Sequence, residues 1–171
     1  SLLFCEISLQ NIMNKSEVDE NDFLDRVNLI NGLGINVIIS KYQYHSEFLS
    51  YFDMFKLFNI GILIGSITFS DLFNEDYYDE IEGGILESFG MLFKKNMKMY
   101  VYPALQKDST ELLRADNIDV SKKNSYLHKF VMETGKVENI ENYNKDVMHI
   151  FARKLLKMIQ NDEKGWEDKV P

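Results

Sequence analysis

Short apolar runs alternate with amphipathic segments over residues 1–103, and this alternation restricts the fold more than any other feature of the sequence. Four runs have the length and the β-branched or aromatic content of buried strands; they span residues 2–7, 35–39, 60–64 and 97–102. Strands that alternate with helices are typically parallel strands joined by crossover helices. We therefore predict an α/β fold: a three-layer, Rossmann-like open sheet, mostly parallel, with four to five strands.

Between these runs, apolar residues recur at three- and four-residue steps, which is the spacing of one helix face. The first predicted helix ends at Gly32 and Gly34, because glycine adopts the left-handed conformation at little cost; its apolar side carries Phe23, Leu24, Val27 and Ile30. An aromatic-faced helix is expected around residues 48–55, a short helical turn at 68–74 and a longer helix at 81–94.

Beyond Pro103 the pattern changes to a polar loop or arm at 106–120 and two helices, at 125–133 and 146–160. The last helix has a broad apolar stripe, which packs either within the chain or against a second copy: Val147, Ile150, Phe151, Leu155 and Met158. Packing within the chain is the simpler expectation for this stripe, while the aromatic content of 13%, high for a small domain, predicts a homodimer. We expect a single domain over 1–171, with the alternating core at 1–103 and the polar arm and C-terminal helices at 104–171.

Charge and composition exclude several classes of function. A formal charge of −8 argues against a general nucleic-acid binder, which needs clustered Lys and Arg. One cysteine cannot form an intramolecular disulfide framework. No apolar stretch is long enough to span a membrane, so we expect a cytoplasmic protein without membrane partners. The sequence starts almost directly with a strand and without Met, and we expect a fragment whose partner is the remainder of its own longer chain.

Ligands of open α/β sheets bind beyond the carboxyl ends of the strands. Seven residues occupy such positions in the predicted sheet: Glu6, Ser8, Ser40, Lys41, Gly65, Ser66 and Tyr102. A phosphate could contact the hydroxyls of Ser40 and Ser66, with Lys41 as the counter-charge. Serines at these positions also serve as ordinary turn and cap residues. His45 follows the second strand and is the histidine best placed for acid–base chemistry, although a surface or helix-capping role is the more common one for such a residue.

No metal site is predicted. Residues 71–87 carry seven acidic residues and no basic ones, but the alternating spacing of a calcium-binding loop is absent. Acidic side chains near a helix start are favourable on electrostatic grounds alone, so we interpret this run as a solvated face. The three histidines show no HExxH pair, and no glycine-rich phosphate-binding motif occurs.

Serine and lysine at strand ends also occur in the haloacid dehalogenase fold. That family uses an Asp nucleophile after its first strand, with a second Asp two residues on; here Glu6 and Ser8 stand at those positions. A glutamate would displace the attacking oxygen by one methylene, and a misplacement of that size can cost about a hundredfold in rate. Phosphatase activity is therefore not expected.

Four stretches resemble the C-terminal part of a family of uncharacterised bacterial proteins: LLFCEISLQNIM, FLDRVNLINGLGINVIIS, IEGGILESFGMLFKKNMKMYVYP and MHIFARKLLKMIQNDEKGWEDKVP. Names given to its members include nicotinate- or nicotinamide-nucleotide adenylyltransferase, and names linked to TonB. The resemblance thus implies a nucleotide-related activity. However, the (H/T)xGH and ISSTxxR-like signatures of such adenylyltransferases are absent here, and a TonB-dependent barrel does not fit an α/β pattern. No catalytic residue is carried over.

Two functions remain open from the sequence. The first is a non-catalytic assembly or regulatory module of a bacterial cytosolic protein. The alternative is a nucleotide- or phosphoester-handling enzyme, adenylyltransferase-like or haloacid-dehalogenase-like, with its site at the strand ends named above. The sequence leaves both the catalytic residues and any cofactor undetermined.

Overall fold

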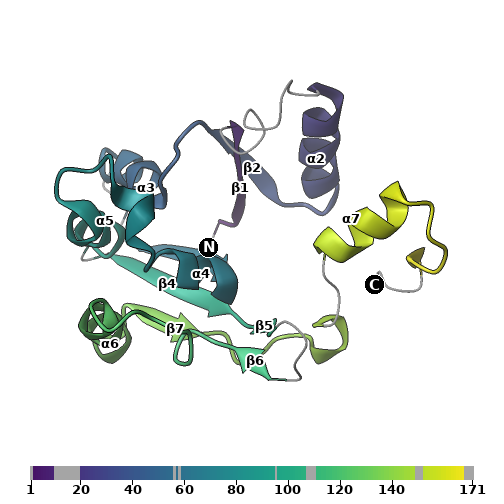
Figure 1. The fold of residues 1–171 in the computed structure, drawn as a ribbon. Coiled ribbons are helices and arrows are strands. Elements are labelled where there is room, and N and C mark those ends of the chain that lie inside the picture. The colour runs from purple at the N-terminus through teal and green to yellow at the C-terminus, as the bar shows by residue number, and fades with distance from the viewer. Residues whose placement is uncertain are drawn as a thin grey trace. The chain divides into compact units, whose positions relative to one another are not determined.

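The computed structural model describes residues 2–9, 20–55, 57, 59–94, 96–106, 111–148 and 152–167. Its contacts group the chain into two compact units, which we call the first unit (Ser1–Phe58 with Leu86–Lys94) and the second unit (Asn59–Ile85 with Lys95–Pro171). Figure 1 labels the helices and strands and colours the chain by residue number. The single-domain organisation expected from the sequence stays a prediction.

The first unit begins with two parallel strands and the helix between them (Figure 1). β1 (Phe4–Ser8) pairs with β2 (Asn36–Ser40), and α2 (Glu20–Gly32) lies against β2. The helix ends as predicted: Gly34 has a φ of +77°, and its N–H donates to the Asn31 carbonyl at 2.9 Å. A positive φ of this kind favours glycine, because a Cβ would be strained there.

Helix α2 has one half-buried side and exposed leucines on both edges of that side. The half-buried side chains lie at the predicted three- and four-residue steps: Phe23, Val27 and Ile30. Leu24 was predicted with them but is exposed, because it is turned by about 100° from Phe23 around the helix axis. Leu29 and Leu33 are also exposed, at 68% and 71%. Apolar surface on two sides is typical of a helix that packs between two layers.

The buried apolar side chains of the first unit come from two other helices. They are Leu49 of α3 (His45–Asp53) and Phe89 and Leu92 of α5 (Gly84–Leu92). Around α3 the aromatic rings form a chain of edge and tilted contacts, as the predicted aromatic face suggests: Tyr42, Phe48, Tyr51, Phe52 and Phe55. No described apolar side chain of β1, α2 or β2 is buried.

The second unit contains a three-stranded parallel sheet in the order β3–β4–β7, formed by Ile60–Gly65, Met97–Tyr102 and Val137–Asn139. One face of the sheet is buried, with Met99 and Val101 both at 0% exposure. Phe69 of α4 (Ser66–Asp71) and Val131 of α6 (Ser125–Glu133) are fully buried as well. The core of the second unit lies on this face.

The segment after Pro103 is more structured than the predicted loop or arm at 106–120. β5 (Ala104–Leu105) pairs antiparallel with β6 (Leu112–Leu113), while residues 107–110 lie outside the described part. Ala115 and Ile118 are buried. This structure could not be predicted, because the few apolar residues of the polar stretch 106–120 show neither helical nor strand periodicity.

The C-terminal helices were predicted in part. Helix α6 has the predicted bounds, and Gly135, with a φ of +67°, follows it. The predicted helix at 146–160 appears as a short 3-10 helix (Lys145–Val147) and α7 (Ala152–Gln160). Ile150 and Phe151 of the predicted stripe lie outside the described residues, while Leu155 and Met158 are half-buried.

The structure confirms an α/β protein in which helices alternate with mostly parallel strands. All four predicted strands occur, shifted by at most two residues at either end. β7 is an addition that the sequence did not predict, because a strand of three residues is too short to show alternation. Across the described ranges, no helix combines the length and apolarity needed to cross a membrane.

Candidate functional site

Three predicted site residues meet at the carboxyl ends of β1 and β2. The parallel register places Ser8 opposite Ser40, and Glu6 stands two residues before Ser8 on the same face of the sheet. The Ser40 hydroxyl donates to Glu6 Oε1 at 2.5 Å. The Ser8 hydroxyl donates to the Tyr42 carbonyl at 3.2 Å, which ties the end of β1 to the loop after β2.

His45 is the first residue of α3 and lies within electrostatic range of Glu6. Neighbouring atoms partly desolvate the imidazole, and this lowers the pKa of His45 below its ordinary value; the Glu6 carboxylate raises it, but by less. The ring therefore favours the neutral form, which can accept a proton. Its side chain is exposed, so solvent still reaches part of it.

The remaining predicted residues do not join this group. Lys41 is exposed in the loop after β2. Gly65 and Ser66 lie in the second unit, where Gly65 ends β3 and Ser66 begins α4. Ser66 is fully buried, and its hydroxyl has no hydrogen-bond partner within the described ranges. Ser40 and Ser66 belong to different units, so a phosphate held jointly by the two hydroxyls stays a prediction.

In the first unit the Glu6 carboxylate accepts a hydrogen bond from Ser40 and lies within electrostatic range of His45. Ser40 is nearly buried, and its one hydroxyl proton points to Glu6. An anion at this edge would meet the Glu6 carboxylate rather than a free hydroxyl donor, and like charges at close range repel. The geometry therefore favours a structural bond between β1 and β2 over a phosphate cradle.

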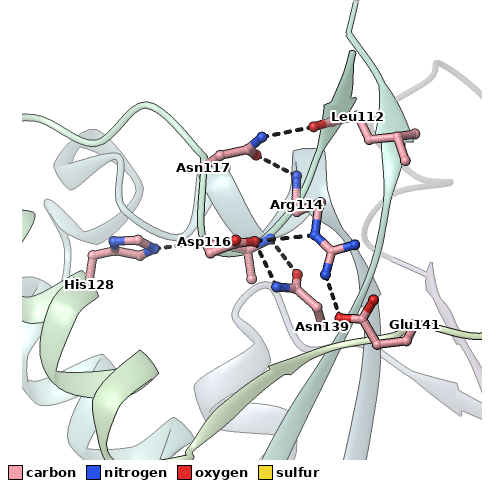
Figure 2. Close-up of polar contacts among 8 residues, drawn as sticks. Leu112, Arg114, Asp116, Asn117, His128, Asn139 and Glu141 are labelled. Carbon is pink, nitrogen blue, oxygen red and sulfur yellow. Dashed lines mark hydrogen bonds and ion pairs between the residues drawn. The ribbon is translucent and has the colours of Figure 1, made fainter. Parts of the chain in front are cut away.

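A larger polar network lies in the second unit, beyond the carboxyl end of β7 (Figure 2). Asn139, the last residue of β7, holds the loop after β6 from two directions. Its Oδ1 accepts from the Ala115 N–H at 2.8 Å, and its Nδ2 donates to Asp116 Oδ1 at 2.7 Å. His128 Nε2 lies 2.7 Å from the Ala115 carbonyl, so both backbone groups of this buried residue are bonded.

Arg114 extends the network to the chain after β7. Its Nη2 donates to Glu141 Oε1 at 2.5 Å, and its Nε lies 3.4 Å from Asp116 Oδ1. These partners, chiefly the Glu141 bond, raise the pKa of Arg114. Partial desolvation opposes ionisation of Asp116, but the bonds from Asn139 and Arg114 outweigh it and lower the pKa of Asp116.

Asn117 closes the loop. Its side-chain oxygen accepts from the Arg114 N–H at 2.7 Å, and its amide donates to the Leu112 carbonyl at 2.9 Å (Figure 2). Because nearly every polar group here is already bonded to the loop, the network fixes the loop's shape. The open carboxylate surface that remains belongs to Asp116 and Glu141, whose side chains are 57% and 69% exposed.

No pattern in the sequence predicts this network. Its residues are ordinary polar types spread over 112–141, and no motif links them. The one local signal is Asn117, three residues after Arg114, because asparagine side chains often bond to nearby backbone in turns. The long-range partners Asn139 and Glu141 lie at the end of β7 and just after it, and the sequence did not predict this strand.

Within the described part of the chain, no three His, Cys, Asp or Glu side chains are grouped so that they could hold a metal ion. Comparison of the chain with protein-family models, with curated proteins and with solved structures found no match. The function is therefore argued from the two polar groups and from the exposed apolar surface.

Proposed function

We propose that this chain is a non-catalytic assembly or regulatory module of a longer bacterial cytoplasmic protein. The observation that carries the proposal is the apolar surface of the β1–α2–β2 segment, where Leu24 and Leu29 of α2 and Leu33 just after the helix are all exposed. Parallel strands in proteins are usually covered on both faces. Each exposed leucine would contribute about 1.5–3 kcal/mol to the free energy of docking if a partner covered it completely.

The partner of this surface is the remainder of the longer chain. In the described part of β1, α2 and β2, Ser40 is the single buried side chain. Such a segment forms its strand pair and its helix but buries little apolar area by itself. If the segment docks on another part of the longer chain, that part supplies the second layer of apolar side chains. This kind of docking is what a regulatory or assembly module does.

The enzyme alternative has less support. A nucleotide or phosphoester would have to displace the bond between Ser40 and Glu6, and would then lie beside a carboxylate. We expect no thermal shift with nucleotides, nicotinamide mononucleotide, phosphate or Mg²⁺. A ligand at a concentration about a hundredfold above its dissociation constant would raise the free energy of unfolding by about 2.7 kcal/mol. If one of these ligands raises the melting temperature and Lys41→Ala abolishes the increase, the enzyme alternative is correct and our proposal is wrong.

The docking proposal is tested in the full-length protein by hydrogen exchange. We expect the α2 amides to exchange slowly there and fast in the 171-residue chain alone. Leu29→Gln should remove the protection in the full-length protein without unfolding this chain, because the side chain is exposed in it. Asn28→Gln, on the adjacent exposed position, is the control. Equal exchange of α2 in both proteins would overturn the proposal.

We propose the finer architecture as well, a three-layer Rossmann-like sheet of four to five strands. It is supported by the parallel sense of every pair in β1–β2 and β3–β4–β7. The Ile60 N–H donates toward β4, so by alternation the amides of Gly61 and Leu63 point away from β4. These two amides should be protected from exchange if β3 is an internal strand. Rapid exchange at both would contradict the single sheet.

A further inference from the structure

Helix α6 carries two aromatic side chains on its solvent side. Tyr126 is 82% exposed and Phe130 is 59% exposed. They are four residues apart, so they lie one above the other on the same face of the helix. Tyrosine and phenylalanine are enriched at protein interfaces relative to the rest of the surface. We call these two residues the α6 aromatic pair.

The opposite side of α6 holds the helix in place, so a rotation of the helix cannot bury the aromatic pair. Val131 is 1% exposed. At the start of the helix, the Asn124 side chain donates to the Phe73 carbonyl at 3.0 Å. Further along, His128 Nε2 lies 2.7 Å from the Ala115 carbonyl. These contacts fix the aromatic pair toward solvent.

The charges around the aromatic pair have a definite order along the helix. Lys122, just before α6, is exposed, and its ammonium group makes no ion pair within the described residues. Glu133 ends α6 and pairs with Lys129, but at 3.7 Å and with both side chains about two-thirds exposed. An exposed pair of this kind contributes little, so the Glu133 carboxylate can still accept from another cation. The exposed face is therefore basic before the aromatic pair and acidic after it.

We propose that the α6 aromatic pair binds the same face of a second copy of this chain, with the two helices antiparallel about a two-fold axis. Tyr126 of one chain then contacts Phe130 of the other, and this contact occurs twice. Lys122 of one chain lies near Glu133 of the other, because the two residues are at similar distances from the aromatic pair on opposite sides of it. A two-fold contact requires a surface that is complementary to itself, and the charge order of α6 meets this requirement.

The charges also favour this arrangement over a parallel one. Parallel helices would place Lys122 beside Lys122 and Glu133 beside Glu133, and like charges repel. The inference gives a specific surface to the homodimer that the aromatic content predicts. It is independent of the proposed docking of β1–α2–β2, because it uses residues of the second unit alone.

Light scattering over a concentration series gives the first test. The contact is at the small end of protein interfaces, so we expect the mass to rise from 20.1 kDa toward twice that value above about 100 µM. Phe130→Glu should abolish the rise, because it introduces a charge into an apolar contact. Tyr77→Glu, at another aromatic residue of the second unit that is 52% exposed, is the matched control and should leave the rise unchanged.

Circular dichroism checks that each variant is folded. A mass of 20.1 kDa at every concentration would overturn the proposal. So would a dimer that survives Phe130→Glu in a folded chain.

Charge reversal tests the antiparallel order. Lys122→Glu should weaken the dimer by about tenfold, because it replaces two attractive pairs with two repulsive ones. Adding Glu133→Lys to the same chain should restore the dimer, since each pair again has opposite charges. Lys145→Glu, at an exposed residue outside α6, is the control and should have no effect. A double variant that dimerises no better than Lys122→Glu would overturn the antiparallel contact.

Cross-linking identifies the residues in contact. In a Cys5→Ser background, a Tyr126→Cys chain is mixed with an isotope-labelled Phe130→Cys chain, treated with a short bis-maleimide, and analysed for linked peptides. We expect links between positions 126 and 130 of different chains to exceed links between two copies of position 126. The reverse order would contradict the proposal, and so would a dimer without either link.

Discussion

The β1–α2–β2 segment and the β3–β4–β7 sheet both consist of parallel strands, yet their interiors differ. In the sheet, Met99 and Val101 are completely buried. In β1–α2–β2 the corresponding apolar side chains, such as Val37 and Ile38, are only half-buried. Backbone pairing contributes little net stability because water offers equivalent hydrogen bonds. Strand pairing and a crossover helix are therefore enough to form a βαβ unit, but a buried core also requires a second layer of apolar side chains.

The largest expected effect compares one truncation in the two regions. Val101→Ala should lower the free energy of unfolding by about 1.5–3 kcal/mol, because a fully buried valine loses its apolar contacts. Val37→Ala removes the same atoms from a half-buried position and should cost less than about 1 kcal/mol. Urea denaturation followed by circular dichroism measures both. Equal losses would show that the β1–α2–β2 segment has a core of its own.

A second comparison concerns asparagine side chains. Asn139→Ala should lower the free energy of unfolding by about 1–3 kcal/mol, because it leaves the Ala115 N–H without its acceptor. Asn36→Ala in β2 removes a 3.4 Å bond to the Leu3 carbonyl in an exposed position and should cost less than about 0.5 kcal/mol. The same denaturation experiment applies. If Asn139→Ala is as mild as Asn36→Ala, the network of Figure 2 does not hold the loop.

The smallest effect is the pH dependence from His45. The pKa of His45 is lowered in the folded chain, so the unfolded chain binds more protons as the pH falls through the ordinary histidine value of about 6.5. Stability should therefore be lost on going from pH 7.5 to pH 5.5. His45→Gln should reduce this loss, measured as the shift of the urea midpoint. A larger loss in the variant would contradict the direction that we assign.

The periodic elements could be predicted from the sequence because their signals are local. Helix α6 was placed at its observed bounds, and the glycines at 34 and 135 ended their helices. The meeting of Glu6 and Ser40 also follows from two strand ends in parallel register. By contrast, Asn139 and Ala115 are 24 residues apart, and their bond depends on β7, a strand too short to show a period. Contacts of that kind depend on the tertiary fold, which no local pattern encodes.

The exposed apolar surface was likewise beyond sequence reasoning. Leu63 and Met99 both belong to convincing apolar runs, but one is exposed and the other is buried. Periodicity tells which residues share a face. It does not tell whether a second layer covers that face.

Residue-resolved hydrogen exchange on the isolated chain tests the central claim, that β1–α2–β2 has no core of its own. The account predicts that the β2 amides bonded to β1 exchange at least about a hundredfold faster than those that join β4 to its neighbours. Equal protection of the two sets of amides would contradict it.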